Sequence, residues 1–432
     1  MKKLIVIGAG ASGMLAAGRA AELGVDVLLL EKMPEPGKKL MISGKTRCNL
    51  TNSADLDEFI SAYGSNGKFL FPAFHKFFRP ELLDLMRSIG IETKVERGGR
   101  IFPVSDNASD VVDALKWYLK INGVKITPGV RVMGITTDAG RVTGVKTAKK
   151  DYPATAVVLA TGGASFPETG SEGDGYRIAQ ELGHTIIKLR PSLVPLYTEE
   201  IKGLDKEGVT LRNIKLTAYK CRVDDISHVS KRMVIDKRFG EITLTRNCIR
   251  GPIALQMSLA IVKALESGAV SLEIDLKPAL STIQLKARLQ REFDRAGKRS
   301  LRTILKELLP VKLIEPLILL SKIPGEKTAN QINAHEKEKL ATFIKMWRLN
   351  VLKSFPLEAA MVTSGGVALN EIDPGTMASR IIRGLFFCGE VIDIDAETGG
   401  YNLQAAFSTG YLAGESAASY IRSLPVLDAP QQ

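Results

Sequence analysis

Apolar residues follow two short-range patterns along this chain, and both occur near its beginning. Leu4 to Ile7 is an uninterrupted apolar run before a glycine, which predicts a buried parallel strand. Met14 to Leu23 has apolar residues at helical spacing, and a glycine follows where the helix should end. Val25 to Leu30 is a second buried run and is followed by an acid. These segments predict a βαβ unit at the start of the chain.

Similar patterns return later in the chain, separated by a long segment without periodicity. Pro34 to Asn52 is rich in glycine and lysine, so we expect a long functional loop there. Phe59 to Ile89 is predicted to form helical segments. Ala156 to Ala160 and Leu385 to Cys388 are further buried strands, and Leu403 to Tyr420 is predicted to be a closing helix.

The middle of the chain differs from both ends. Val194 to Leu276 alternates apolar and polar residues, which favours antiparallel β-structure, and Ile283 to Leu352 is predicted to form several helices. We therefore expect an α/β fold in which residues 1–190 and 359–432 form one discontinuous nucleotide-binding domain. Residues 191–280 would be an inserted β-rich domain, and residues 281–358 an inserted helical domain.

The chain has 432 residues, and its 59 basic and 47 acidic residues give a net charge of +12. We take the basic residues to be spread along the chain, and the densest helical stretch, Lys277 to Lys312, to be a solvated helical face. On this interpretation the charge attracts a phosphorylated cofactor. We expect a small-molecule substrate, and an anionic compound would suit the positive charge. Neither nucleic acid nor a membrane is expected as a partner.

Cysteine usage and hydropathy favour a cytoplasmic location. Cys48, Cys221, Cys248 and Cys388 form no Cys-x-x-Cys pair, which is typical of a reducing compartment. The sequence shows neither a signal-peptide pattern nor an apolar run of about 18 residues, so we expect neither secretion nor a membrane anchor. No cluster of metal ligands is expected either.

Gly8-Ala9-Gly10-Ala11-Ser12-Gly13 is a G-x-G-x-x-G motif between the first strand and the first helix. Its glycines allow a tight turn, close approach to a pyrophosphate, and close packing of helix on strand. The helix N-terminus offers N–H groups and a partial positive charge to phosphates. Glu31, 18 residues after Gly13 (31 − 13), can accept hydrogen bonds from a ribose and would repel a 2′-phosphate. The motif predicts FAD or NAD and argues against NADP at this site.

Three further segments carry a family resemblance. They are Ser43–Asn52; Ala160–Gly163 with Thr169–Gly175; and Thr363–Val367 with Gly389-Glu390 and Thr398–Gln404. Together they resemble the flavoprotein family that includes aminoacetone oxidase and the BaiN-like bile-acid enone reductases, over essentially the whole chain. The resemblance implies FAD rather than NAD, in a Rossmann-like domain of the two-dinucleotide-fold type with a large insertion.

The resemblance and the glycine motif together give a set of candidate cofactor residues. For Arg47 and Asn49, loop structure is the alternative to cofactor contact. Cys48 is interpreted as a small buried thiol, with a position near the flavin as the alternative. The N–H groups at the start of the closing helix could favour negative charge on a reduced flavin. The full set is Gly8, Gly10, Ala11, Ser12, Gly13, Glu31, Lys32, Arg47, Asn49, Thr161, Gly162, Gly389, Glu390, Gly400, Tyr401, Asn402 and Leu403.

One segment departs from the family pattern. Where relatives usually have Thr-His, Gly and then Ser-Gly-Pro, this chain has Arg246, Cys248 and Arg250 in place of the His, Gly and Ser. If the segment lines the substrate side, the pocket is more cationic than in relatives and suits an anionic substrate. The alternative is that both arginines form salt bridges at a domain interface.

The redox chemistry would belong to the flavin, so no nucleophilic side chain is required. Tyr401 is a candidate proton donor, and none of the four histidines lies in a catalytic motif. No second G-x-G-x-x-G follows a strand, so NADH or NADPH would bind transiently or not at all. Three functions remain open: an NAD(P)H-dependent reductase of a conjugated C=C bond, an amine oxidase that uses dioxygen, and a non-enzymatic flavin-binding regulator.

Overall fold

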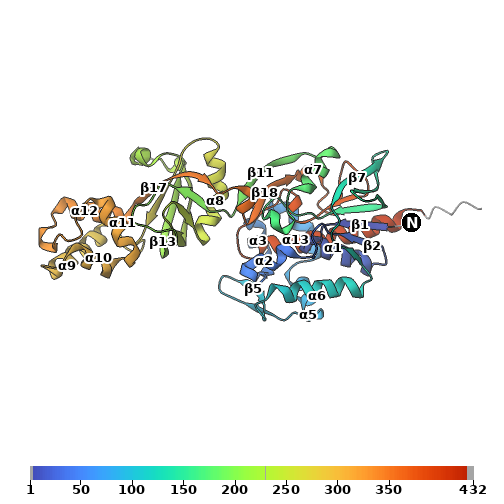
Figure 1. Ribbon diagram of the computed structural model, residues 1–432, viewed down its shortest axis with the longest axis horizontal. Helices are drawn as coiled ribbons and strands as arrows, with labels where there is room; N and C mark the ends of the chain where they lie inside the picture. Colours follow the sequence, from blue (N-terminus) through green and yellow to red (C-terminus); the bar gives the residue numbers. More distant parts are fainter. Residues whose placement is uncertain (1–2, 229, 426–432) are drawn as a thin grey trace, which may run out of the picture. The chain divides into compact units, whose positions relative to one another are not determined.

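The computed structural model describes residues 3–228 and 230–425, and the chain divides into two compact units (Figure 1). Unit 1 comprises Met1–Arg190 together with Met361–Gln432, and unit 2 comprises Pro191–Ala360. The two ends of the chain therefore belong to one unit, and the segment between them forms the other.

A five-stranded parallel sheet is the centre of unit 1, with the strand order β19-β10-β1-β2-β6. Both β1 and β10 are buried along their apolar residues, because the two faces of a parallel sheet are covered. The predicted α/β fold is confirmed, including the strand contributed from the chain's end. The strands are β1 (Lys3–Ile7), β2 (Asp26–Leu30), β6 (Lys125–Thr127), β10 (Ala156–Leu159) and β19 (Leu385–Phe387).

Two helices from opposite ends of the sequence meet almost backbone to backbone. They are α1 (Ala11–Glu22) and α13 (Tyr401–Ser423). A Cβ atom on Gly410 would lie 2.3 Å from the carbonyl oxygen of Ser12, and one on Gly414 would lie 2.2 Å from that of Ala16. The spacing of four residues places both glycines on one face of α13. Only hydrogen side chains leave room for this approach.

The residues between β2 and β6 form short helices and a small antiparallel sheet. The expectation of a continuous loop over Pro34–Asn52 was wrong in part, because α2 spans Lys38–Thr46 and Leu40 anchors it in the core. The helix is interrupted at Ser43, Gly44 and Lys45, whose φ/ψ angles are not helical. The other elements here are β3 (Thr51–Asn52), α3 (Leu56–Ala62), α4 (Phe71–Lys76), α5 (Arg79–Ser88), β4 (Thr93–Val95), β5 (Arg100–Pro103) and α6 (Ala108–Ile121).

The remaining elements of unit 1 surround the central sheet. A three-stranded antiparallel sheet precedes β10, and a separate strand pair joins β11 to β18. Their bounds are β7 (Val132–Asp138), β8 (Arg141–Thr147), β9 (Tyr152–Pro153), α7 (Asp174–Glu181), β11 (Ile186–Ser192) and β18 (Val362–Val367).

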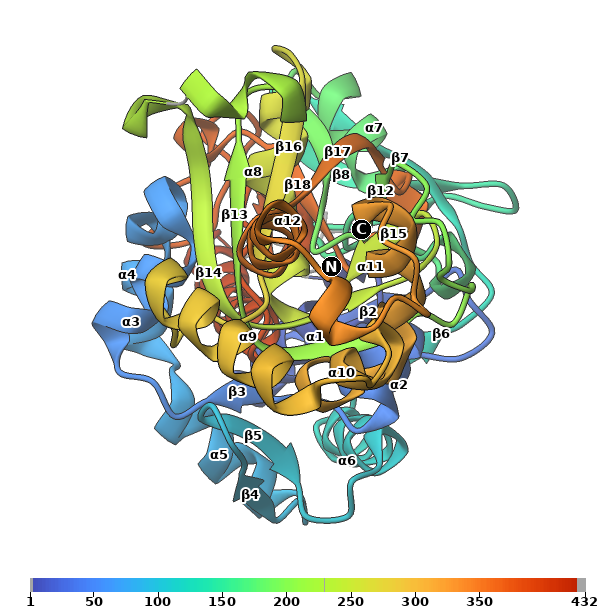
Figure 2. The same ribbon diagram turned by 90° about the vertical axis from the view of Figure 1, so that its left-hand side faces the viewer.

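Unit 2 contains a closed barrel with the order β12-β15-β14-β13-β16-β17, together with five helices (Figure 2). The strands are β12 (Leu196–Thr198), β13 (Val209–Tyr219), β14 (Val234–Leu244), β15 (Cys248–Arg250), β16 (Val270–Asp275) and β17 (Trp347–Ser354). The helices are α8 (Pro252–Leu265), α9 (Thr282–Ala296), α10 (Leu301–Leu308), α11 (Ile314–Ser321) and α12 (Ala334–Lys345).

Two elements of unit 2 correct the sequence prediction. The segment expected to be antiparallel β contains α8, whose buried Ile253, Met257 and Ile261 recur every four residues after Pro252 at the first helical position. The segment expected to be helical ends in β17, where Trp347, Leu349 and Val351 alternate toward the core. Barrel and helices share one apolar core, so residues 191–280 and 281–358 form a single unit instead of two.

Within the described residues, none of the helices combines the length and the apolar character that a bilayer span requires.

Replacing Gly414 by leucine is expected to destabilise the protein by about 1–3 kcal/mol or more, because the new side chain must push α13 away from α1. Chemical denaturation followed by circular dichroism measures this change. Gly134 on β7 has no atom within 4 Å of an added Cβ, so Gly134→Leu is the matched control and should cost much less. An equal decrease in the free energy of unfolding for the two variants would contradict the close contact between α1 and α13.

Candidate functional site

The carboxyl ends of four parallel strands lie at one edge of the sheet in unit 1. Gly8 follows β1, Glu31 follows β2, Thr161 comes two residues after β10, and Gly389 comes two residues after β19. In open α/β sheets, ligands bind outside these strand ends. The structure therefore brings together candidate residues that are more than 350 positions apart in the sequence.

The glycine motif leaves space at one position and is closely packed at the other two. A Cβ atom on Gly8 would lie 2.5 Å from the carbonyl oxygen of Ala160, and one on Gly13 would lie 1.9 Å from that of Gly8. An added Cβ on Gly10 meets no atom within 4 Å. Gly10 also precedes α1, and no described side chain caps its N-terminus. A pyrophosphate could fill this space and accept hydrogen bonds from the first N–H groups, those of Ala11 and Ser12 among them.

Glu31 lies against the glycine loop. One carboxylate oxygen accepts a hydrogen bond from the N–H of Ala9 at 2.7 Å, and the other accepts one from the N–H of Met33 at 2.8 Å. A carboxylate has about four acceptor positions, so ribose hydroxyls can still be bound. Lys32 points elsewhere, since its ammonium group pairs with Glu172 at 3.2 Å and Asp174 at 2.9 Å. The predicted role of Glu31 fits this geometry, whereas Lys32 is used to hold α7.

Glu390 is the centre of a polar cluster after β19. Lys39 of α2 pairs with it at 2.7 Å, and the N–H of Thr363 donates a hydrogen bond to its other oxygen at 2.8 Å. The hydroxyl of Ser165 is 2.8 Å from the ammonium group of Lys39. Lys39, Thr363 and Ser165 were missed by the sequence analysis, although each lies within or beside a segment that carries the family resemblance.

The loop after α2 contains three of the candidate residues. Arg47 forms ion pairs with Glu96 and Asp106, and its guanidinium lies over the ring of Phe102 at 4.3 Å. The structure therefore shows the alternative role for Arg47, that of tying the loop to β5 and its neighbours. Asn49 differs, because within the described chain its buried side-chain oxygen has no hydrogen-bond partner. Cofactor contact by Asn49 remains a prediction that this orphan acceptor supports.

Burial controls the chemistry of Cys48. Its side chain is fully buried, and burial raises the pKa of the thiol to about 12, while a hydrogen bond with Ser43 acts in the opposite direction. Cys48 is therefore a neutral thiol at physiological pH. The interpretation of Cys48 as a small buried side chain fits this environment.

The start of α13 forms a second helix N-terminus at the site. Gly399 and Gly400 have φ angles of 140° and 100°, and a Cβ on Gly400 would lie 2.3 Å from the carbonyl oxygen of Thr51. Asn402 fixes this turn through hydrogen bonds at 2.9 Å with both the N–H and the carbonyl oxygen of Ala396. No described side chain caps α13, so its first N–H groups, including that of Leu403, remain for a ligand. The side chain of Asn402 itself is used structurally.

Tyr401 is half-buried beside this turn. Its ring contacts the edge of Phe59 at 4.7 Å between centroids, and its carbonyl oxygen accepts a hydrogen bond from Tyr63 at 2.6 Å. Burial raises the pKa of the Tyr401 hydroxyl, and the charges of Glu58 and Glu397 raise it further. The hydroxyl is therefore protonated at neutral pH and can donate a proton. Two residues after the end of β10, the buried hydroxyl of Thr161 has no hydrogen-bond partner in the described chain.

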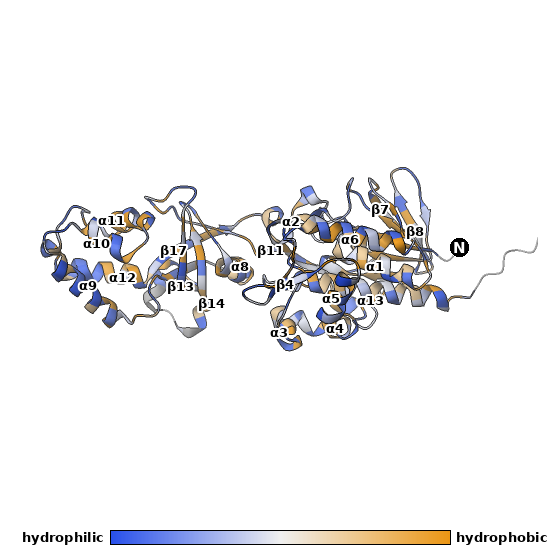
Figure 3. Ribbon diagram, turned by 90° about the horizontal axis from the view of Figure 1, so that it is seen from below, coloured by the Kyte–Doolittle hydropathy of each residue, from blue (hydrophilic) through white to orange (hydrophobic). Residues whose placement is uncertain are grey.

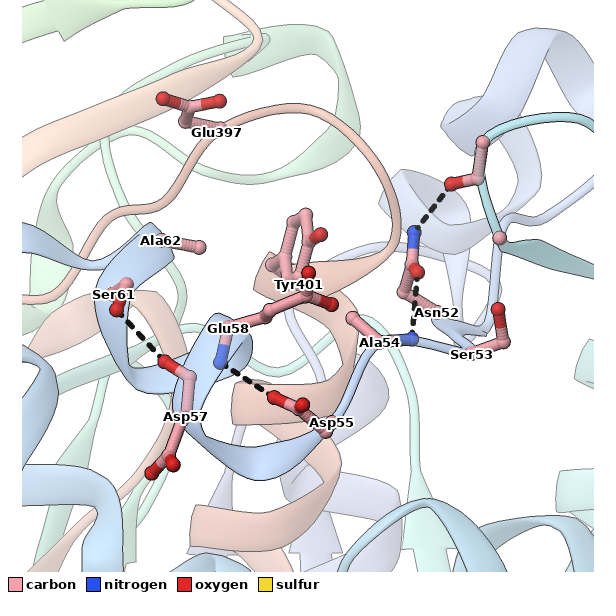
Figure 4. A pocket seen from close by; sticks show the side chains of 12 residues that line it. Asn52, Ser53, Ala54, Asp55, Asp57, Glu58, Ser61, Ala62, Glu397 and Tyr401 are labelled. Carbon is pink, nitrogen blue, oxygen red and sulfur yellow. Dashed lines mark hydrogen bonds between the residues drawn. The ribbon is translucent and has the colours of Figure 1, made fainter.

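Tyr401 also borders an open groove with a volume of about 940 Å³ (Figure 4). Asn52 holds its wall by donating hydrogen bonds to the carbonyl oxygens of Gly399 at 2.8 Å and Gly98 at 3.1 Å. Four carboxylates give the groove an acidic lining: Asp55, Asp57, Glu58 and Glu397. The lining includes Tyr401 and none of the glycines at the strand ends.

The two arginines of the departing segment lie in unit 2. Arg246 pairs with Glu200, whose side-chain oxygen is 2.6 Å from the arginine Nε, so its salt bridge lies within unit 2, whereas the alternative had placed it at a domain interface. Arg250 is exposed on β15 opposite Thr243 and has no ion pair among the described residues. Placement of either arginine beside the substrate remains a prediction.

Among the histidines that the structure describes, His184 is held by a polar contact in the core. His184 is buried, its Nε2 is 2.8 Å from the hydroxyl of Ser379, and burial lowers its pKa. The side chain of His228 lies outside the described residues. The described residues also contain no group of three His, Cys, Asp or Glu side chains that could hold a metal ion.

Comparison with protein families gives a match over residues 2–416 to the family described as the HI0933-like protein Rossmann domain. The chain belongs to this family. It is also 34% identical over 423 residues to a 3-dehydro-bile acid Δ(4,6)-reductase of Clostridium scindens, which covers 97% of this chain and 99% of the relative. A ribosomal RNA dihydrouridine synthase of Escherichia coli is 30% identical, with 95% of this chain and 96% of the relative covered.

Solved structures show the same fold at much lower identity. A 3-ketosteroid Δ1-dehydrogenase of Sterolibacterium denitrificans matches with a TM-score of 0.52 at 14% identity, covering 97% of this chain and all of that one. The FrdA subunit of the E. coli quinol fumarate reductase matches with a TM-score of 0.51 at 16% identity, covering 98% of this chain and 71% of FrdA. With the family match, these findings make the HI0933-like chain an FAD-dependent oxidoreductase with a Rossmann-type domain. The residues at the strand ends fit that cofactor, since Gly10 leaves an open space, Thr161 has an orphan hydroxyl and the N-terminus of α1 is uncapped.

Replacing Gly10 by alanine is expected to leave the fold intact and to weaken FAD binding by about tenfold or more. The added Cβ meets no protein atom, and the φ of −81° suits alanine, but the methyl group occupies the space expected for the pyrophosphate. Titrating flavin-free protein with FAD and following its fluorescence measures the affinity. Gly134→Ala, which also faces open space, is the control. Unchanged affinity in Gly10→Ala would place the cofactor elsewhere.

Proposed function

We propose that this chain is an FAD-dependent reductase that saturates a C=C bond conjugated to a carbonyl group. The two curated relatives support this reaction class, because their names describe the same bond change in different molecules. A Δ(4,6)-reductase acting on a 3-dehydro-bile acid removes double bonds conjugated to a ketone, and a dihydrouridine synthase saturates the C=C bond of a uracil ring, which is conjugated to its carbonyl. The relatives are named enzymes, so the non-enzymatic alternative is set aside.

Reduction of such a bond places one hydride on the carbon distant from the carbonyl and one proton on the carbon beside it. Bound FAD would supply the hydride through its N5 atom. The chain must then hold the cofactor, supply the proton and exclude water. Gly10, the N-termini of α1 and α13, and the carboxylates of Glu31 and Glu390 are the groups that would hold FAD.

The hydroxyl of Tyr401 is the proton donor in this proposal. Its raised pKa keeps the proton in place at neutral pH, and the uncapped α13 N-terminus beside it favours negative charge that develops nearby. NADH or NADPH is the proposed electron source. Since the sequence has no second glycine motif after a strand, the nicotinamide would bind transiently.

A second candidate function is oxidation of a small amine by dioxygen. The acidic groove beside Tyr401 favours it, because four carboxylates attract a protonated amine. The electron donor separates the two functions, since an oxidase takes electrons from its amine and needs no nicotinamide.

Anaerobic addition of NADPH or NADH to the FAD-loaded protein is expected to bleach the flavin absorbance. An α,β-unsaturated ketone, added next, should restore the colour as it is reduced. Protein that is bleached by aminoacetone and by neither nicotinamide would establish the oxidase instead. Protein that is bleached by none of these compounds would contradict both functions.

Replacing Tyr401 by phenylalanine is expected to lower kcat for the enone by about a hundredfold, because a positioned proton donor typically contributes that much or more. FAD affinity should change little, since the hydroxyl makes none of the contacts that hold α13 in place. The pH profile should also lose the limb set by the tyrosine. Tyr411→Phe on the same helix is the control, and equal kcat values for the two variants would exclude Tyr401 as the donor.

A further inference from the structure

Nearly all of the chain's net positive charge belongs to one of its two units. Unit 2 has 30 Lys and Arg against 19 Asp and Glu, which gives +11, whereas unit 1 has 29 against 28, which gives +1. Basic residues are therefore spread over both units, as expected, but acids balance them only in unit 1. The unit that carries the strand-end site is nearly neutral, so the charge of unit 2 is not explained by a phosphorylated cofactor at those strand ends.

Part of this charge forms an ordered row on α9. Leu285, Leu289 and Phe293 face the core of unit 2. Arg288, Arg291 and Arg295 follow one another at spacings of three and four residues, so they share one outward face over roughly 10 Å of helix.

We call this row, with the neighbouring Lys277, the α9 stripe. Among the described residues, none of its three arginines has an ion-pair partner, while Lys286 on another face of α9 pairs with Glu338 at 2.6 Å. Glu292 and Asp294 lie next to the row along the helix, but neither forms an ion pair with its members in the described chain, and Asp294 accepts a hydrogen bond from Gln290. Burial lowers the pKa of Lys277, and the positive charge of Arg288 lowers it further, so these cations repel each other. An anionic partner would relieve this repulsion.

The barrel of the same unit exposes an aromatic ring between cations. Phe239 on β14 is 64% exposed, and Lys237 lies two residues before it on the same face of the strand. Lys215 of β13 is directly opposite Phe239 in the sheet. An exposed ring flanked by cations can stack on an unpaired base while the cations bind phosphates.

We propose that unit 2 is a docking surface for single-stranded RNA. The α9 stripe binds backbone phosphates, and Phe239 stacks on a base. RNA fits better than an acidic protein because a flat base uses the exposed ring as well as the charge. It fits better than a membrane because Ile283 is the one large exposed apolar residue on α9 among the described residues. Figure 3 shows in addition that α9 is predominantly hydrophilic, which also argues against a membrane.

The inference rests on the proposed function in one respect only, the identity of the substrate, which would be a uracil base within RNA.

The test uses the FAD-loaded full chain and a fluorescein-labelled uridine-rich RNA of 16 nucleotides, with fluorescence polarisation measured over a range of salt concentrations. Arg288→Gln/Arg291→Gln/Arg295→Gln should weaken binding by about tenfold or more and reduce the slope of log Kd against log salt by about 2, because each single-strand phosphate contact contributes about 0.7. Phe239→Ala should weaken binding by about tenfold with little change in that slope.

Lys125→Gln/Lys146→Gln/Lys149→Gln removes the same charge from exposed positions of unit 1 and is the matched control. Its affinity for RNA should stay close to that of the wild type. An equal loss of RNA affinity in the control and in the triple arginine variant of the α9 stripe would show a non-specific charge effect and overturn the proposal. Binding to phosphatidylglycerol vesicles or polyglutamate without binding to RNA would overturn it as well.

Because no electron donor is present, RNA binding is measured independently of catalysis. Wild-type protein that binds RNA but reduces no conjugated C=C bond would contradict the proposed function and leave the docking surface standing. Protein that reduces an enone but does not bind RNA would contradict the docking surface alone.

Discussion

The parallel pairing of β10 with both β1 and β19 is the constraint on which the rest of unit 1 depends. It aligns three strands whose carboxyl ends point the same way although they come from the beginning, middle and end of the chain. The groups proposed to hold the cofactor follow one of these strands or the neighbouring β2, or they lie at the N-terminus of α13, which packs against α1. Unpairing β19 would separate Glu390 from the glycine loop and remove the support of α13.

Close backbone contact is what makes this arrangement possible. Glycines at the β1–α1 turn and along α13 allow backbone atoms to approach to distances that a Cβ would forbid, while Gly10 leaves open space. The same absence of a side chain therefore has opposite uses at neighbouring positions, packing at Gly13 and access at Gly10. Around this rigid frame, ion pairs such as that of Lys39 with Glu390 orient the polar groups.

The two units differ in net charge and in sheet architecture. Unit 1 carries balanced charge, a buried parallel sheet and the polar groups at its strand ends, which suits the binding of one cofactor. Unit 2 carries nearly all of the net charge on a closed barrel and its helices, and a closed barrel has no free sheet edge at which to pair with another chain. Its exposed arginines and aromatic ring are the features on which the proposed RNA docking rests.

The sequence by itself determined the βαβ unit, the glycine motif, a dinucleotide as the cofactor and the discontinuous domain, because these depend on local hydrophobic period and on glycine spacing. The choice of FAD over NAD came from the family resemblance. It did not reveal α8 or β17, whose short apolar patterns are ambiguous until their neighbours bury one face. It also could not show that Arg47 would be taken by Glu96 and Asp106, or that Lys39 would reach Glu390 from 351 residues away. Only the tertiary structure decided those pairings, because an ionised side chain pairs with whichever opposite charge the folded chain brings near.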